Sequence, residues 1–131
     1  MIDKTQAMEI LLSACPSFEE SWRRHVEEYG VDLLYIAAGQ FASHLLTLYQ
    51  ANAEESLLAT GIAIERLHVE GSPWVKEFAT IGVLEGVQNS WSHSSVDPSS
   101  FVQYLGPESR RWWQGLNKFW SSEAPNVRAE G

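Results

Sequence analysis

The residues of this sequence best suited to chemistry are a glutamate and a histidine three positions apart, Glu65 and His68. On a helix this spacing places both side chains on one face, where a carboxylate and an imidazole can bind one metal ion. A carboxylate-bridged di-iron centre needs a second such pair, but the comparable segment that begins at Glu85 carries Gln88 where the second histidine would stand. The sequence thus holds half of a metal site, and a helical-bundle metal-binding protein or enzyme organised around Glu65, His68 and Glu85 is the alternative function.

Internal pairing explains the same glutamates without a metal. Glu65 and Glu85 interrupt the two most apolar segments of the chain, and a carboxylate buried without a partner costs several kcal/mol. We therefore expect Arg66, His44, His68 or an indole N–H to satisfy them. The sequence has no Gly-rich phosphate loop, no Gly-x-Ser-x-Gly and no His-Glu-x-x-His. We expect no metal, no cofactor and no enzymatic activity.

A second candidate site lies in the C-terminal stretch GPESRRWWQGLNKFW, residues 106–120. Its large apolar residues are spaced as the stripe of one helix, and they are Trp112, Trp113, Leu116, Phe119 and Trp120. This spacing predicts docking onto the core. Because two adjacent indoles cannot both enter one groove, we expect one of them, Trp113, to remain partly exposed beside Arg110. Trp112, Trp113 and Arg110 are therefore predicted partner-binding residues.

The charge of the chain favours a cationic partner. Seventeen acidic residues stand against nine basic ones, giving a net charge of −8, and most of the excess acid precedes residue 71. This balance opposes binding to phosphate backbones, so we expect no nucleic acid as partner. The acids of residues 19–28 alternate with arginines at helical spacing, which leaves Asp32, Glu54 and Glu55 as the unmatched acids predicted to contact a partner.

Apolar periodicity predicts an all-α fold, a single-domain array or bundle of five to six helices over residues 1–120, followed by a flexible tail over 121–131. The expected helices cover about 3–14, 17–30, 32–50, 52–71, 73–91 and 107–120, with a short turn at 99–104. Expected capping pairs are Asp3 with Gln6, Ser17 with Glu20, and Asn52 with Glu55. Period-two alternation over a useful length is missing, so strands are not expected.

Cysteine content and hydropathy indicate a cytoplasmic protein. A single cysteine, Cys15, excludes an intramolecular disulfide, and the richest apolar stretch, VDLLYIAAGQFASHLL, is interrupted by polar residues before it could span a bilayer. We therefore expect a soluble protein that does not enter the membrane.

Two motifs resemble a group of small bacterial proteins of unassigned function. The segments GSPWVKEFATIGVLEGVQN and FVQYLGPESRRWWQGLNKFW share with that group a Trp-Val-x-Glu-Phe-Ala run and a Leu-Gly-Pro-Glu-Ser…Trp-Trp ending. The resemblance covers about residues 50–120 and implies a helical fold but no particular chemistry. Small, acidic, helical proteins are frequent among bacterial immunity proteins and antitoxins, which is an analogy of class. The prediction is a cytosolic protein-binding module, most plausibly an immunity-type inhibitor of a toxin, whose oligomeric state the sequence leaves open.

Overall fold

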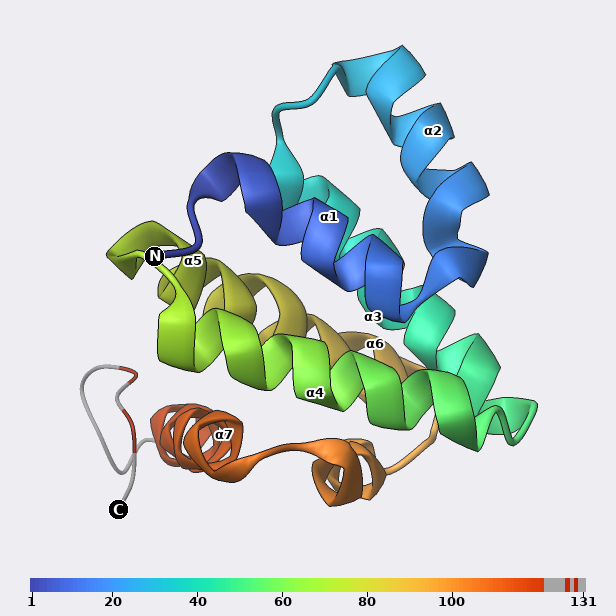
Figure 1. Ribbon diagram of the computed structural model, residues 1–131. Coiled ribbons are helices and arrows are strands. Elements are labelled where there is room, and N and C mark those ends of the chain that lie inside the picture. The colour runs from blue at the N-terminus through green and yellow to red at the C-terminus, as the bar shows by residue number, and fades with distance from the viewer. Residues whose placement is uncertain (122–126, 128, 130–131) are drawn as a thin grey trace.

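The computed structural model describes residues 1–121, 127 and 129. Within them the chain forms seven α-helices, two short 3-10 segments and one π-helical stretch, and no strand (Figure 1). In chain order the elements are α1 Lys4–Ala14, η1 Pro16–Phe18, α2 Glu19–Tyr29, α3 Leu34–Gln50, α4 Glu54–Glu70, α5 Pro73–Glu77, η2 Phe78–Leu84, α6 Glu85–His93, η3 Pro98–Tyr104 and α7 Pro107–Trp120. The all-α class is confirmed, whereas the expected five to six helices are too few.

The extra helix arises where the sequence pattern predicts one continuous helix over 73–91. The chain follows that path, but the π-helical stretch η2 separates α5 from α6. Two glycines one turn apart, Gly82 and Gly86, lie there against Ala38 and Ala42 of α3; a Cβ on each glycine would come within 3.2 and 3.1 Å of the alanine Cβ atoms. Small residues on both helices therefore let α3 and α6 approach closely.

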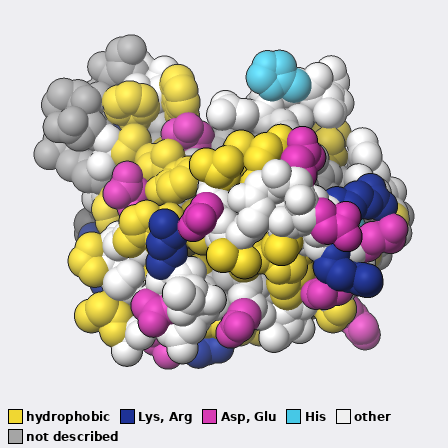
Figure 2. Space-filling model, turned by 90° about the horizontal axis from the view of Figure 1, so that it is seen from above, with side chains coloured by type: hydrophobic (Ala, Val, Ile, Leu, Met, Phe, Trp, Pro, Cys, Tyr) yellow, Lys and Arg dark blue, Asp and Glu magenta, His cyan; other side chains and the backbone are white. Residues whose placement is uncertain are grey.

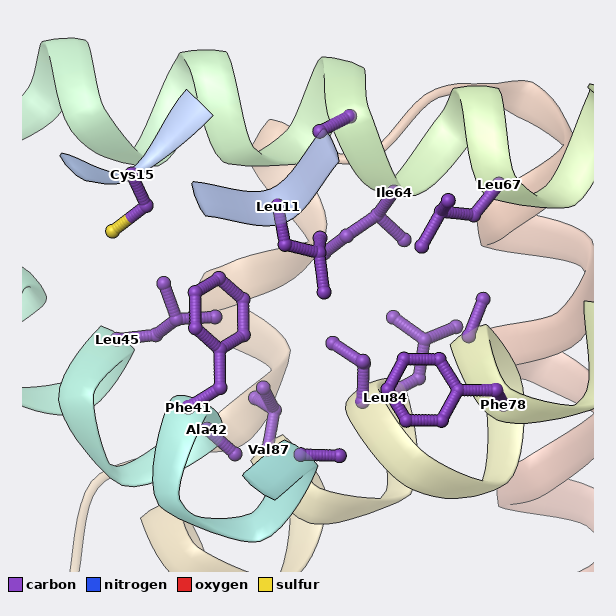
Figure 3. Packing of buried hydrophobic residues seen from close by; sticks show 14 of the residues in the cluster. Leu11, Cys15, Phe41, Ala42, Leu45, Ile64, Leu67, Phe78, Leu84 and Val87 are labelled. Atoms are coloured by element: carbon purple, nitrogen blue, oxygen red, sulfur yellow. The ribbon is translucent and has the colours of Figure 1, made fainter. Parts of the chain in front are cut away.

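The core lies between α1, α3, α4 and the η2–α6 segment. Figure 3 shows Leu11, Phe41, Ile64, Phe78 and Leu84 pointing toward one another from these four elements, and all five are fully buried. In Figure 1, α7 and η3 lie on the side of α4 opposite to α1, while α2 projects away from the body of the molecule. The N-terminal residue Ile2 exchanges backbone hydrogen bonds with Glu70 and Ser72 at 2.9 and 2.8 Å, which fixes the start of α1 beside the end of α4.

Helix starts agree with the sequence where the cap is local. Asp3 and Gln6 form the expected capping box, and Ser72 caps α5 through the backbone N–H of Val75. The other two expected capping boxes are wrong. The hydroxyl of Ser17 bonds to Nε2 of His44 at 2.7 Å, and Asn52 takes a left-handed conformation with φ of 58° one residue before the N-cap of α4.

The flexible tail expected over 121–131 falls mostly on residues 122–126, 128 and 130–131, which lie outside the described part of the chain. Among the described helices none is long and apolar enough to cross a membrane.

Two glycine substitutions test how tightly α4 packs against η3. A Cβ at Gly61 of α4 would lie 1.8 Å from the carbonyl oxygen of Tyr104, whereas one at Gly39 of α3 would meet nothing within 4 Å. Gly61→Ala should lower the free energy of unfolding by about 2–3 kcal/mol because backbone must move. The matched Gly39→Ala should raise it by about 0.5–1 kcal/mol through helix propensity. Chemical denaturation measures both, and equal effects would contradict the close approach.

Candidate functional site

Glu65 caps a helix that is distant in sequence. Its Oε2 accepts from the backbone N–H of Glu108 at 3.0 Å, and its Oε1 accepts from the backbone N–H and the hydroxyl of Ser109 at 2.9 and 2.8 Å. These donors form the first turn of α7, whose N-cap residue, Gly106, has no side chain to offer. The carboxylate of Glu65 thus accepts the hydrogen bonds that a side chain at the N-cap of α7 would normally accept. It also faces the positive end of the α7 dipole.

Gly106 leaves the space that this contact needs. A Cβ on Gly106 would stand 2.5 Å from Cδ of Glu65, so any larger residue would displace the carboxylate. Gly61 lies one helical turn before Glu65 on the same face of α4 and makes the close approach to Tyr104 described above. Gly61 on α4 and Gly106 before α7 therefore allow α4 to pack closely against the η3–α7 connection.

His68 continues the network inward. Its Nδ1 lies 2.8 Å from the Ser109 hydroxyl and its Nε2 lies 2.9 Å from the hydroxyl of Thr80 in η2. The hydroxyl of Thr80 also lies 3.1 Å from the backbone carbonyl oxygen of Lys76. Both ring nitrogens of His68 are engaged, and Ser109 is fully buried, so a substrate has no access to this serine. We name Glu65, His68, Thr80 and Ser109 the α4–α7 network.

The two ionisable members of the network respond to burial in opposite ways. Burial acts to raise the pKa of Glu65, but the hydrogen bonds from Ser109 and Glu108 outweigh it, and the net pKa is lowered. Burial lowers the pKa of His68 to about 4, although the nearby carboxylates of Glu65 and Glu108 act against this shift. At neutral pH the network therefore contains a charged carboxylate and a neutral imidazole.

The structure does not bring Glu85 into this network. In the described residues no group of three or more His, Cys, Asp or Glu side chains is placed to hold a metal ion. Glu85 is half-buried, its side chain forms no hydrogen bond within the described chain, and burial raises its pKa. Two of the partners expected for the glutamates are committed elsewhere, since Arg66 pairs with Glu70 at 3.2 Å and His44 bonds to Ser17.

The prediction that Trp113 of α7 remains partly exposed is wrong. Trp113 is only 2% exposed and packs in the core with Leu116. Trp112 is half-buried, in a groove with Ile81, and Arg110 donates from Nε to the Leu105 carbonyl at 2.8 Å. Neighbouring side chains on a helix point about 100° apart, and the phase of α7 turns Trp113 inward, which spacing alone could not decide.

The predicted partner-binding acids separate into two places. Glu54 and Glu55 are exposed at the start of α4, where Oε1 of Glu54 accepts from the hydroxyl of Tyr104 at 3.1 Å. Asp32 instead lines a groove between α1 and α2, which contains neither glutamate. Asp32 lies beside the apolar side chains of this groove, whereas Glu54 and Glu55 precede the exposed Leu58 and Ile62 of α4.

This α1–α2 groove has a volume of about 460 Å³. Residues from α1, α2, the α2–α3 turn and the start of α3 line it, and they are Lys4, Thr5, Met8, Glu9, Leu12, Trp22, Val31, Asp32 and Leu34. Exposed apolar side chains cluster in the adjoining turn and the start of α3: Val31 (67% exposed), Leu33 (54%), Tyr35 (40%) and Ile36 (42%). Figure 2, which views the molecule from above Figure 1, shows hydrophobic side chains gathered in a band with charged side chains beside it.

The α2–α3 turn is held in an unusual conformation. Leu33 has φ of 53° and ψ of 45°, a left-handed conformation that a bulky residue rarely adopts. His25 of α2 is buried, stacks on Trp22 at 5.3 Å between ring centroids, and donates from Nε2 to the carbonyl of Asp32 at 2.9 Å. The turn is thus fixed by a buried side chain while its own apolar side chains face solvent.

One family comparison gives a match over most of the chain. The family described as a domain of unknown function (DUF7674) matches residues 8–121. The chain belongs to the DUF7674 family. Comparisons with curated proteins and with solved structures find no match. The DUF7674 match includes the α4–α7 network and all but two of the residues that line the α1–α2 groove.

Sequence reasoning missed several residues of this DUF7674 domain that matter here. Ser109 and Thr80 complete the α4–α7 network, and Val31 and Leu33 form the exposed turn. For Ser109 and Thr80 the sequence did contain one signal. A helix that begins Gly106-Pro107 has no capping side chain of its own, which indicates that an acceptor must reach it from elsewhere.

Burial of neutral His68 should make this DUF7674 domain less stable in mild acid. The folded pKa of about 4 lies below the ordinary 6.5, so between these values the unfolded chain binds more protons and stability is lost as pH falls. The full loss is about 3 kcal/mol. His68→Gln, which cannot titrate, should flatten the unfolding free energy between pH 6.5 and 5.5, because this range lies above the ordinary carboxyl pKa of 4.5, near which the lowered pKa of Glu65 begins to cause its own loss of stability.

Chemical denaturation across this pH window is the measurement. His93→Gln provides the control, because it removes an exposed imidazole that lies outside the α4–α7 network. An identical slope in the His68→Gln and parent proteins would show that the imidazole is not buried in its neutral form.

Proposed function

We propose that this protein is a protein-binding module whose α1–α2 groove and adjoining turn hold an apolar segment of a cationic partner. The observation that carries the proposal is the cluster of exposed apolar side chains at residues 31–36 beside the groove. Water-exposed apolar clusters of this kind are typical of surfaces that another molecule covers. The fixed turn supports the same function, since a surface that is ordered before binding loses less entropy on binding.

The charges around the groove favour a basic partner. Glu9 and Asp32 line it, and the whole chain carries −8. The basic residue of the groove, Lys4, places its Nζ 5.0 Å from the ring centroid of Trp74, so its charge is directed toward an aromatic ring of α5. Acidic groups beside an apolar surface attract a partner with basic residues next to its apolar side chains, and they speed association.

Immunity-type inhibition of a toxin is the finer form of this proposal. Small size, acidity and helical content support it by analogy with bacterial proteins of that class, and a cytoplasmic location belongs to the same proposal. The metal-binding alternative has no observation in its favour, because the oxygens of Glu65 and the nitrogens of His68 are already hydrogen-bonded.

A pair of matched substitutions tests the surface. The probe is a fluorescent synthetic amphipathic helix of leucine and lysine, with a version that replaces lysine by glutamate as the charge control. Val31→Asp should weaken binding of the basic peptide by about tenfold or more, because it places a charge in the apolar contact. Ile62→Asp on α4 is the matched control, since both side chains are 67% exposed. Fluorescence anisotropy measures the affinities.

The role of charge is tested separately through association rates. Asp32→Lys should slow binding of the basic peptide, and the difference from the parent should shrink as salt is raised. Glu55→Lys, at an exposed site away from the groove, should change the rate less. Preference for the acidic peptide, or a larger loss with Ile62→Asp than with Val31→Asp, would contradict the proposed surface. For the inhibitor role, co-expression with a toxin encoded by the neighbouring gene should restore growth, and Val31→Asp should abolish the rescue.

A further inference from the structure

A second cavity, of about 280 Å³, lies between α6, the start of η3 and α7. It shares no lining residue with the α1–α2 groove. Its walls combine three amide side chains, Gln88, Asn89 and Asn117, with the indoles of Trp113 and Trp120. The cavity is therefore polar and aromatic, whereas the groove is mainly apolar.

Gln88 is the most informative residue of this cavity. Its side chain is 9% exposed, and its Nε2 donates to Oδ1 of Asn117 at 3.2 Å. Its Oε1 is buried and has no hydrogen-bond partner among the described residues. A buried amide oxygen without a donor destabilises a fold, and it is retained here together with a donor bond from Nε2 that holds the Asn117 amide at the cavity wall.

The neighbouring polar groups are also available. Asn89 and Ser92 share the α6 face that lines the cavity, and within the described chain neither side chain forms a hydrogen bond. Asn117 keeps its amide N–H groups after accepting from Gln88. The indole N–H of Trp113 likewise makes no hydrogen bond to the described residues. The walls thus offer donors and acceptors together, which is what a hydroxyl group requires because it both donates and accepts.

Charge argues against an anionic ligand. Among the described residues that line the cavity, Asp97 is the one with an ionisable side chain, and its Oδ1 accepts from the backbone N–H and the hydroxyl of Ser99, which caps η3. Its carboxylate and the net charge of −8 repel phosphates and carboxylates. Trp120 is 55% exposed and can offer a ring face to the apolar C–H face of a ligand. The volume is near the lower limit for small-molecule sites, which fits a single ring.

From this geometry we infer that the cavity between α6 and α7 binds a neutral, hydroxyl-rich ring of the size of one monosaccharide unit. The hydroxyls bond to Asn89, Ser92 and Asn117, and the C–H face packs on Trp120. This site is independent of the α1–α2 groove, so it stands whether or not the groove binds a protein.

Side-chain amide and indole signals in two-dimensional ¹H–¹⁵N NMR spectra report on the cavity directly. Titration of the full chain with D-glucose, D-galactose and D-mannose should produce saturable shifts at the amides of Gln88, Asn89 and Asn117 and at the indole N–H groups of Trp113 and Trp120 with at least one sugar. Asn89→Ala should weaken that affinity by about tenfold. Gln114→Ala removes an exposed amide of α7 outside the cavity and should leave it unchanged.

A second variant separates binding from folding. Gln88→Met keeps most of the side-chain volume and removes both the unpaired oxygen and the donor to Asn117, so the thermal midpoint should stay near that of the parent while sugar binding weakens because the Asn117 amide is no longer held. The inference is overturned if none of the three sugars gives saturable shifts at the cavity. It is equally overturned if Asn89→Ala and Gln88→Met bind as tightly as Gln114→Ala, or if glucose 6-phosphate binds more tightly than glucose.

Discussion

The contact between the Glu65 carboxylate and the first turn of α7 determines how the second half of the chain is arranged. Helix α7 begins at Gly106-Pro107 without a capping side chain, and its first N–H groups face α4. If the carboxylate were absent, these donors would be left unpaired in a partly buried position. Glu65 can reach them because Gly106 has no Cβ, and α4 as a whole can come near because Gly61 has none. One face of α4 therefore specifies both the position of α7 and the path of η3.

The protons of this network can be counted. If the single hydroxyl proton of Ser109 goes to Glu65, as the 2.8 Å contact indicates, Nδ1 of His68 must donate to Ser109 and Nε2 must accept from Thr80. Thr80 then has no proton left for the Lys76 carbonyl, so the neutral imidazole cannot satisfy every contact at once. A protonated imidazole would, but burial opposes the charge and holds the pKa of His68 at about 4. The network is a compromise in which desolvation outweighs one hydrogen bond.

Helix positions followed from the sequence because apolar spacing and local caps act within a few residues, as at Asp3 and Ser72. The failures share one cause, which is that tertiary contacts decided the outcome. Ser17 met His44, 27 residues away, and Glu65 met Ser109, 44 residues away. No spacing rule pairs such residues, and none could choose between Trp112 and Trp113 as the inward side chain. The exposure of Val31 and Leu33 could not be predicted for the same reason, because the sequence does not show whether other side chains will cover an apolar residue.

The two ends of the molecule differ in how completely folding explains them. At the α4–α7 junction the close approaches and the hydrogen bonds of Glu65 fill a structural need, so Gly61, Gly106 and Glu65 are accounted for by stability. At the α2–α3 turn the opposite holds: Leu33 adopts a strained conformation and leaves most of its side chain in water, which gains no burial in return. His25 nevertheless holds this turn through the Asp32 carbonyl. A conformation that opposes stability and is still held in place is the feature of the fold that supports the proposed binding surface at this turn.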